Sequence, residues 1–151
     1  MINQNNRFPI EYQQNSQSCG PVSLMMVAKY FGYNYSLEEL SHLCGLTHEG
    51  VSLANLAAGA ESIGLHTLSV RCSINDVATI IQLPAIVLWN GNHFIVVYDV
   101  DNDYFYVSDP AKGHICYTYE EFRKGWCPKG EKTGILMAIE PTIDNKVLNE
   151  E

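Results

Sequence analysis

The first half of the chain carries apolar residues at helical spacing. Leu24, Val27 and Phe31 fall on one face of a segment that opens at Cys19 and is followed by Gly32. The segment begins Cys-Gly-Pro, and proline suits the first turn of a helix because the backbone N–H that it lacks has no partner there. Glycine is the usual residue just after a helix end. The pattern therefore predicts a helix that starts at Cys19 and is ended by Gly32.

Three capping boxes mark the starts of further helices. In this motif a Ser or Thr side chain accepts the backbone N–H three residues on, and an acidic side chain there accepts an N–H in return. The boxes lie at residues 36–39, 73–76 and 118–121. The first helix is closed by Gly45, the second must end before Pro84, and the third ends near Gly125. One more helix, over about residues 52–63, is followed by Gly64.

The second half changes from helical spacing to short runs of β-branched and aromatic residues. Such runs, bounded by Asn, Asp, Gly or Pro, favour strands. The runs are residues 85–89, 93–100, 104–108, 115–117 and 135–139. Turn sequences separate the first four, at residues 90–92, 101–103 and 109–113. Short turns of this kind predict an antiparallel sheet.

Two weaker strand signals fall in the first half. One is residues 67–71, and the other lies around residues 8–10, inside a polar lead-in of residues 1–11. Helices first and an antiparallel sheet second is the pattern of an α+β fold. This is the fold class that the sequence predicts.

Length and composition favour one compact domain. The chain has 151 residues, 46% of them hydrophobic, and an ordinary domain has roughly 100–200. The apolar runs fall far short of the ~20 residues that a membrane-spanning helix requires, and no basic-then-apolar opening predicts a secretion signal. After Pro141 the sequence turns polar and acidic. We therefore expect a domain over residues 1–141 and a tail over residues 142–151, interpreted as a linker within a longer protein.

Charge and cysteine usage exclude several classes of protein. Nine Lys and Arg against seventeen Asp and Glu give a net charge of −8, which argues against nucleic acid as a partner. An odd number of unevenly spaced cysteines is a poor disulfide framework, and without a Cys-x-x-Cys pair we expect no metal site. Reduced thiols in a cytosolic setting fit best. We interpret four of the five cysteines as structural: Cys44, Cys72, Cys116 and Cys127.

Cys19 is the most informative of the five cysteines. It opens a predicted helix, where unpaired backbone N–H groups and the helix dipole favour a thiolate. An ordinary thiol has a pKa near ~8.5, and an imidazolium beside such a site lowers it. The competing interpretation of any helix-start cysteine is a small core residue. A nucleophile therefore needs further groups around it.

His93 and Asp109 are candidates for those groups. A cysteine nucleophile needs a base, and the base needs a third group that fixes its orientation. His93 begins a strand just after the turn at residues 90–92, and Asp109 ends the next strand. If the two strands pair through the turn at residues 101–103, these residues become neighbours across the sheet. The competing interpretations are a surface histidine on a hairpin and an Asp-Pro that merely opens a turn.

An amide donor for a developing oxyanion is the fourth part of such a site. Gln13 lies six residues before Cys19, close enough to loop back over the helix start. Its side-chain NH₂ and the Cys19 backbone N–H are suited to bind an oxyanion. Gln14 and Gln17 are rivals that spacing alone does not exclude.

These segments together resemble the bacteriocin-processing cysteine peptidases, the papain-like domains at the N-terminus of peptidase-containing ABC transporters. The resemblance rests on Gln six residues before a Cys-Gly that opens a helix, on His-Phe-x-Val-Val from His93, and on Asp-Pro sixteen residues after that His. Each part alone is weak, whereas all four in order are specific. The resemblance covers roughly residues 7–141.

The resemblance implies a papain-like fold and a set of roles. Cys19 would be the nucleophile, His93 the general base and acid, Asp109 the group that orients His93, and Gln13 the oxyanion donor. Family members cut a leader peptide from a ribosomally made precursor after a double-glycine motif, and the attached transporter exports the product. The peptidase domain needs no cofactor or metal. ATP serves the transporter portion, whose membrane and ATPase domains are expected partners in the same chain, at the cytoplasmic face of a membrane.

A double-glycine specificity requires a channel too narrow for side chains. Trp89, Asn90 and Asn92, beside His93, are candidates for its wall, although Trp89 fits the core equally well. The chain departs from the family in having Ser18 where an acidic residue is frequent, and Val-Ser after the Cys-Gly-Pro. Neither departure touches the proposed catalytic groups.

Two other functions remain open at this point. One is a non-catalytic domain that only holds the substrate of a peptide exporter. The other is a different papain-like hydrolase or an acyltransferase, because a fold does not determine a reaction.

Overall fold

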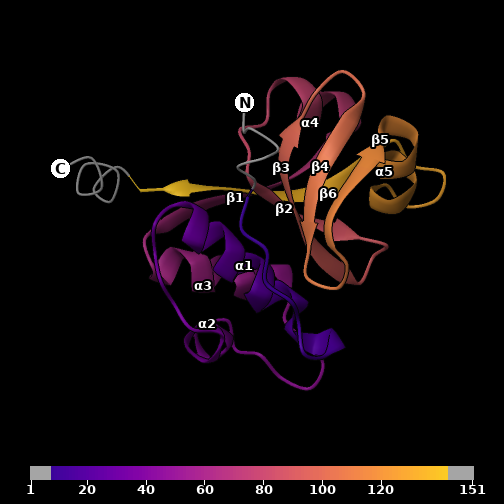
Figure 1. Ribbon diagram of the computed structural model, residues 1–151. Helices are drawn as coiled ribbons and strands as arrows, with labels where there is room; N and C mark the ends of the chain where they lie inside the picture. Colours follow the sequence, from indigo (N-terminus) through magenta and orange to yellow (C-terminus); the bar gives the residue numbers. More distant parts are fainter. Residues whose placement is uncertain (1–7, 143–151) are drawn as a thin grey trace.

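The computed structural model describes residues 8–142, and these residues form helices on both faces of one sheet (Figure 1). The sheet has six strands in the order β1-β6-β2-β3-β4-β5, and every neighbouring pair is antiparallel. The strands are β1 (Leu65–Ser73), β2 (Ala85–Trp89), β3 (His93–Val100), β4 (Tyr104–Asp109), β5 (Gly113–Thr118) and β6 (Thr133–Pro141). The predicted α+β fold class is confirmed.

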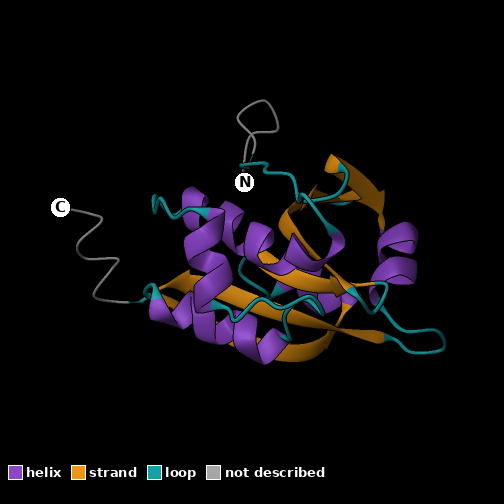
Figure 2. Cartoon of the chain, turned by 90° about the horizontal axis from the view of Figure 1, so that it is seen from below, coloured by secondary structure: helices purple, strands orange, loops and turns teal. Residues whose placement is uncertain are grey.

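The helices divide between the two faces of the sheet. They are α1 (Cys19–Tyr30), α2 (Leu37–Leu43), α3 (Leu53–Ser62), α4 (Ile74–Thr79) and α5 (Tyr119–Trp126), and the 3-10 turn η2 (Ser16–Ser18) precedes α1. The first three form one layer, which Figure 2 shows lying across the strands. The short helices α4 and α5 belong to the other side.

The alternation of side chains along the strands produces two cores. In β3, Phe94, Val96 and Tyr98 join the core under α1, α2 and α3. Ile95 and Val97 join the second core under α4 and α5. Successive side chains of a strand point to opposite faces, so a strand covered on both faces is apolar throughout. This explains the unbroken apolar run after His93 in the sequence.

The helix starts agree with the sequence signals. Ser36 with Glu39, Ser73 with Asp76 and Thr118 with Glu121 each form both hydrogen bonds of a capping box. Helix α1 begins at Cys19 and is followed by Phe31 as its C-cap and by Gly32 at φ +91°. A residue with positive φ ends a helix at little cost only if it lacks a Cβ. The predicted helix limits are therefore confirmed.

The predicted strands lie at the right positions, but several of them are shorter than the strands of the structure. The run at residues 67–71 is part of the longer β1, which pairs with β6 along its whole length from Leu65↔Pro141 to Ser73↔Thr133. The runs at residues 115–117 and 135–139 are likewise the centres of β5 and β6. Pairing with a long neighbour extends a strand into residues whose own strand preference is low.

The predicted strand around residues 8–10 is wrong. Phe8 is buried in the core of α1, α2 and α3, but the segment joins no ladder. Side chains hold it instead: His114 Nε2 lies 2.6 Å from the Phe8 carbonyl oxygen, and Ser108 Oγ donates to the Pro9 carbonyl at 3.0 Å. Proline has no N–H to offer a neighbouring strand.

The predicted tail and lead-in fall mostly outside the described residues. Of the tail predicted at residues 142–151, residues 143–151 lie outside the described part, as do residues 1–7 of the lead-in. Within residues 8–142, no helix combines the length and the apolar character needed to cross a membrane.

Candidate active site

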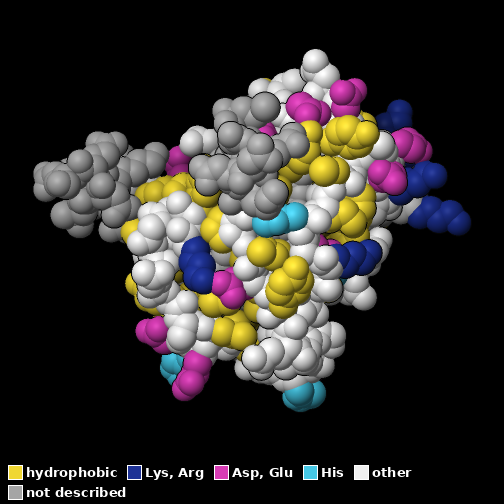
Figure 3. All heavy atoms as spheres, in the orientation of Figure 1, with side chains coloured by type: hydrophobic (Ala, Val, Ile, Leu, Met, Phe, Trp, Pro, Cys, Tyr) yellow, Lys and Arg dark blue, Asp and Glu magenta, His cyan; other side chains and the backbone are white. Residues whose placement is uncertain are grey.

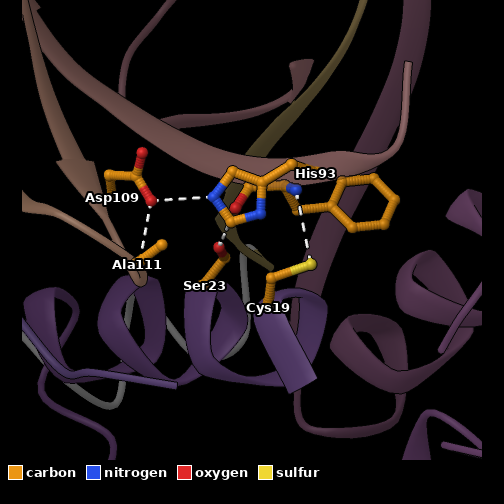
Figure 4. A network of polar contacts seen from close by, with 6 residues as sticks. Cys19, Ser23, His93, Asp109 and Ala111 are labelled. Carbon is orange, nitrogen blue, oxygen red and sulfur yellow. Dashed lines mark hydrogen bonds and ion pairs between the residues drawn. The ribbon is translucent and has the colours of Figure 1, made fainter. Parts of the chain in front are cut away.

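Cys19 lies where the start of α1 meets the start of β3. The turn η2 leads into the helix and is capped by Asn15, whose side chain accepts the backbone N–H groups of Gln17 and Ser18. Cys19 is buried apart from 5% of its surface. Its Sγ accepts the backbone N–H of Phe94 at 3.5 Å (Figure 4). The thiol therefore sits at a helix N-terminus with a second backbone donor from the sheet.

His93 and Asp109 form the pair that the sequence spacing predicted. The β3–β4 hairpin brings the first residue of one strand beside the last residue of the other, and His93 Nε2 lies 2.8 Å from Asp109 Oδ1. The same carboxylate oxygen accepts the backbone N–H of Ala111 at 2.8 Å. The Asp109 side chain is 1% exposed. A buried carboxylate with two donors has a fixed position, and it fixes the imidazole in turn.

The ring of His93 lies between Asp109 and Cys19 (Figure 4). Since Nε2 is bonded to the carboxylate, Nδ1 is the nitrogen that remains for the hydrogen bond with Cys19. A carboxylate at one ring nitrogen keeps a proton there. The other nitrogen is then able to exchange a proton with sulfur or with a substrate.

The charges of the three groups depend on one another. Burial raises the pKa of the Cys19 thiol, but the hydrogen bonds from His93 and from the Phe94 N–H outweigh it and leave this pKa below its ordinary value. Burial lowers the pKa of His93, but the bonds to Asp109 and Cys19 outweigh it and raise this pKa to about 9. Burial raises the pKa of Asp109, but the hydrogen bond with His93 lowers it, and this pKa lies below its ordinary value. The site thus favours a thiolate, an imidazolium and a carboxylate.

The other cysteines have no such neighbours. All five are free thiols. Burial raises the pKa of Cys44 and of Cys72 to about 11, and it also raises the pKa of Cys127. Cys116 is exposed on β5. Reactive cysteines have lowered pKa values, so Cys19 stands apart from the other buried thiols.

Ser23 is a site residue that sequence reasoning missed. Its buried hydroxyl lies one turn after Cys19 and donates to the Phe94 carbonyl at 3.2 Å. Phe94 follows His93 in β3, so this bond ties α1 to the strand that carries the histidine. A lone hydroxyl on the apolar side of the predicted helix was the available signal, because a buried hydroxyl requires a partner.

The structure separates the three candidate glutamines. The Gln13 backbone N–H donates to the Pro110 carbonyl at 2.9 Å, which anchors Gln13 beside the residue after Asp109. The Gln13 side-chain oxygen is buried and has no hydrogen-bond partner within residues 8–142. Gln14 is exposed, whereas Gln17 lines a cleft beside Cys19. Of the three, only Gln13 is linked to the His93–Asp109 side of the site.

The cleft beside Cys19 has a volume of about 250 Å³. One wall is η2, a second is the loop of residues 48–51 between α2 and α3, and the third is Asn92 with Phe94. Val51 also packs on the start of α1, because a Cβ on Gly20 would lie 2.5 Å from Cγ2 of Val51. The loop contains no sequence signal of its own, so its part in the cleft was not predicted.

Of the three residues predicted to form the wall of a channel, only Asn92 lines this cleft. Trp89 is 6% exposed and belongs to the core under α5, where it stacks on Tyr117 at 4.7 Å between ring centroids. Trp89 therefore lies in the core, as its alternative interpretation had it, and does not line the cleft beside Cys19. Asn90 lines a different hollow, next to α5.

Cys19 opens a helix and is hydrogen-bonded to a histidine that a buried carboxylate orients. These groups lie between a helical layer and an antiparallel sheet. This arrangement is that of a cysteine peptidase of the papain-like class. Within the described residues, no group of three or more His, Cys, Asp or Glu side chains is placed to hold a metal ion.

The chain belongs to the peptidase C39 family, whose model matches residues 7–142. It is 28% identical over 142 residues to the lactococcin-G-processing and transport ATP-binding protein LagD of Lactococcus lactis, covering 91% of this chain and 19% of that protein. It is 27% identical over 135 residues to the probable microcin-H47 secretion/processing ATP-binding protein MchF of Escherichia coli, covering 89% and 18%. The chain thus spans about a fifth of the length of these relatives.

A solved structure agrees with the assignment. The crystal structure of a double glycine motif protease from an AMS/PCAT transporter, in complex with the leader peptide, matches with a TM-score of 0.83 at 30% identity. The match covers 90% of this chain and 93% of that chain. The predicted family and the papain-like fold are both confirmed, and the domain is a cysteine peptidase.

Proposed function

We propose that this domain cleaves a precursor peptide after a double-glycine motif and so removes its leader. The observation that carries the proposal is the contact of Cys19 with a His93 imidazole held 2.8 Å from the buried Asp109. The names of LagD and MchF, and the leader peptide bound to the double glycine motif protease, support this choice of substrate.

The first step is attack by sulfur. The Cys19 thiolate adds to the carbonyl carbon of the second glycine, and the carbonyl oxygen becomes an oxyanion. We assign the stabilising donors to the Cys19 backbone N–H and the side-chain NH₂ of Gln13. Donors that are already held in place stabilise the oxyanion without moving during the reaction. The anchor of Gln13 on Pro110 supports this role, because it fixes the glutamine next to the catalytic groups.

The second step is proton transfer from His93. The C–N bond breaks as Nδ1 of the imidazolium gives its proton to the leaving amine, and the acyl group stays on Cys19 as a thioester. His93 then takes a proton from water, and the hydroxide attacks the thioester. The C–S bond breaks and the sulfur leaves as a thiolate while His93 keeps the proton, which restores the thiolate–imidazolium pair. Asp109 holds the ring in place throughout and stabilises its charge.

The position of His93 sets the direction of the substrate. The leaving amine must lie on the His93 side of Cys19, so the residues before the cleaved bond run into the cleft between residues 48–51 and Asn92. Val51, which lines this cleft, packs so closely on the start of α1 that a Cβ on Gly20 would lie 2.5 Å from its Cγ2. Glycine carries no side chain, so a Gly-Gly pair is suited to pass close to this packed helix start, and this supports a double-glycine substrate.

The reaction as proposed uses side chains and water, so we propose that the peptidase domain requires neither metal nor organic cofactor. We further propose that the full protein contains the membrane and ATPase domains of an ABC transporter, that ATP serves that portion, and that this domain works at the cytoplasmic face of a membrane. The names of the longer relatives MchF and LagD, as secretion, processing and transport ATP-binding proteins, support these proposals.

Cleavage of synthetic peptides tests the function directly. One peptide has Gly-Gly before the intended cleavage site, and its matched control has Ala-Ala. We expect cleavage after the second glycine only, identified by mass spectrometry, and none by the Cys19→Ala variant. Cleavage elsewhere, or equal cleavage by Cys19→Ala, would contradict the proposal. Formation of an amide with an added amine would instead identify an acyltransferase, and binding without cleavage a docking domain.

A further inference from the structure

The β3–β4 ladder stops short of Phe94. Its last pair toward that end is Val96↔Ser108, and in the same register Phe94 would face Pro110. Proline has no N–H to offer a neighbouring strand, and the Pro110 carbonyl accepts the backbone N–H of Gln13 instead. Strand β4 therefore gives the backbone of Phe94 no partner.

Helix α1 supplies partners for both backbone groups of Phe94. Cys19 Sγ accepts the Phe94 N–H at 3.5 Å, and the Ser23 hydroxyl donates to the Phe94 carbonyl at 3.2 Å (Figure 4). Residues four apart lie on the same face of a helix, so the two bonds belong to one side of the first turn. Gly20 packs there as well, because a Cβ on it would lie 3.4 Å from Cδ2 of Phe94. The first turn of α1 thus makes the contacts with Phe94 that a paired strand would make.

The bond between Ser23 and Phe94 is shielded from water. Ser23 has no exposed surface, and Phe94 is 6% exposed. By contrast, Figure 3 shows charged side chains spread over the outer face of the molecule, where solvent screens them. Without the Ser23 hydroxyl, the buried Phe94 carbonyl would lose its donor, and an unsatisfied buried group costs more than an ordinary hydrogen bond contributes. The bond therefore resists any movement of Phe94 away from α1.

We propose that Ser23 is a positioning residue for the peptidase reaction, because its bond to Phe94 holds the start of β3 against α1 and keeps His93 at the sulfur of Cys19. The inference rests on the proposed reaction at Cys19. Ser23 does not line the cleft beside Cys19, whereas Phe94 does. Ser23 therefore acts through the strand and makes no contact with the substrate.

A small shift of β3 matters because the thiolate depends on two contacts from this strand. Burial raises the pKa of Cys19, and the hydrogen bonds from His93 and from the Phe94 N–H bring this pKa below its ordinary value. The two partners are consecutive residues of β3, so one movement of the strand weakens both bonds. Without the Ser23 hydroxyl we therefore expect a higher pKa of Cys19 and a slower reaction, since a misplacement of about 1 Å costs as much as 10²-fold in rate.

Alkylation of Cys19 in the Ser23→Ala variant tests the proposal. The rate of modification by iodoacetamide is followed from about pH 5 to 10, and its midpoint gives the pKa of Cys19. We expect Ser23→Ala to move the midpoint up by about 0.5 to 1 pH unit, so that alkylation at low pH slows about three- to tenfold. On a Gly-Gly peptide kcat should fall about tenfold, whereas KM should stay within about twofold because Ser23 does not line the cleft.

Val27→Ala is the matched control for a general loss of packing. Val27 lies one turn after Ser23 on α1 and is fully buried in the same core as Phe94. Its truncation should lower the urea midpoint of unfolding at least as much as Ser23→Ala does. The alkylation midpoint of Cys19 should not move. An equal shift of the alkylation midpoint in both variants, or no shift in Ser23→Ala, would overturn the proposal.

A second substitution serves if Ser23→Ala does not fold. Ser23→Cys keeps nearly the same shape, but a thiol is a weak hydrogen-bond donor. The alkylation midpoint of Cys19 should again move up, and fragmentation of the labelled peptide by mass spectrometry separates Cys19 from the new thiol. An unmoved midpoint in this folded variant would count against the role of Ser23.

Alkylation needs no peptide, so the two proposals fail separately. If Ser23→Ala shifts the alkylation midpoint but the unmodified protein cleaves no Gly-Gly peptide, the positioning role stands and the proposed cleavage is wrong. If the peptide is cleaved and Ser23→Ala matches the unmodified protein in both alkylation and kcat, Ser23 is not a positioning residue.

Discussion

Two buried cysteines at opposite helix ends behave in opposite ways. Cys19 is the first residue of α1 and is 5% exposed, whereas Cys44 is the C-cap of α2 and is 1% exposed. The pKa of Cys19 lies below its ordinary value, whereas burial raises the pKa of Cys44 to about 11. The two thiols belong to the same core. The difference between their pKa values is therefore not caused by burial, which the two thiols share, but by their polar neighbours.

The neighbours differ in kind. Cys19 has an imidazolium partner and the Phe94 N–H, which both favour a thiolate. Cys44 packs against α3 so closely that a Cβ on Gly59 would lie 2.4 Å from its Sγ. An apolar environment without a cation penalises the charged form only. One thiol is thus arranged for reaction and the other for packing, and the experiments below test that distinction.

The largest expected effect is the loss of the nucleophile. Cys19→Ala should reduce kcat/KM on a Gly-Gly peptide by roughly 10⁴-fold or more, because the covalent route disappears. Cys44→Ala should keep kcat/KM within a few-fold. Steady-state kinetics with both variants, checked for folding by circular dichroism, gives the comparison. A fully active Cys19→Ala protein would contradict the assignment of Cys19 as the nucleophile.

Removing the carboxylate should slow the reaction less and change its pH dependence. The active form has a thiolate and an imidazolium, so activity rises as pH passes the Cys19 pKa and falls near pH 9, where His93 loses its proton. Asp109→Asn should reduce kcat by about 10²- to 10⁴-fold. It should also move the alkaline limb of kcat/KM to lower pH, because Asp109 raises the His93 pKa. An unmoved limb would contradict the assignment of that limb to His93.

Alkylation measures the difference between the thiols without a substrate. Brief treatment with iodoacetamide below pH 7 should modify Cys19 and spare Cys44, because its neighbours lower the pKa of Cys19 whereas burial raises the pKa of Cys44 to about 11. His93→Ala should slow modification of Cys19 by about tenfold or more and leave Cys44 unchanged. Mass spectrometry of the digested protein reports both sites at once. Equal labelling of the two cysteines would remove the distinction between them.

The smallest effect concerns stability on the Cys44 side. Gly59→Ala should lower the free energy of unfolding by about 1–3 kcal/mol, because the new methyl group overlaps the sulfur of Cys44. Alkylation of Cys19 should not change. Adding Cys44→Ala removes the sulfur, so the double variant should lose less than the sum of the single losses. Urea titration of the four proteins completes the cycle, and additive losses would show that the contact with Cys44 is not the cause.

Local sequence signals predicted the helix starts and the order of the catalytic groups. A capping box depends on four consecutive residues, so Ser36 and Glu39 identify a helix start without reference to the rest of the fold. A short turn likewise forces neighbouring strands to pair, which is why the spacing of His93 and Asp109 was sufficient to bring them together.

Contacts between distant segments were beyond those signals. Trp89 fits a channel wall or a core equally well by sequence, and only the position of α5 places it in the core. The loop at residues 48–51 lines the cleft because α2 and α3 carry it toward η2. Gln13 differs from Gln17 through its bond to Pro110, a residue almost a hundred positions away.

The sequence by itself determined the fold class, the family, the helix starts and the residues Cys19, His93 and Asp109, because these depend on residue type and short-range spacing. Only the tertiary structure decided which neighbours shift the pKa values of Cys19 and Cys44, and where the cleft runs. The physical reason is that a pKa and a cavity depend on which groups meet in space. Such meetings are set by packing between elements, which local sequence does not encode.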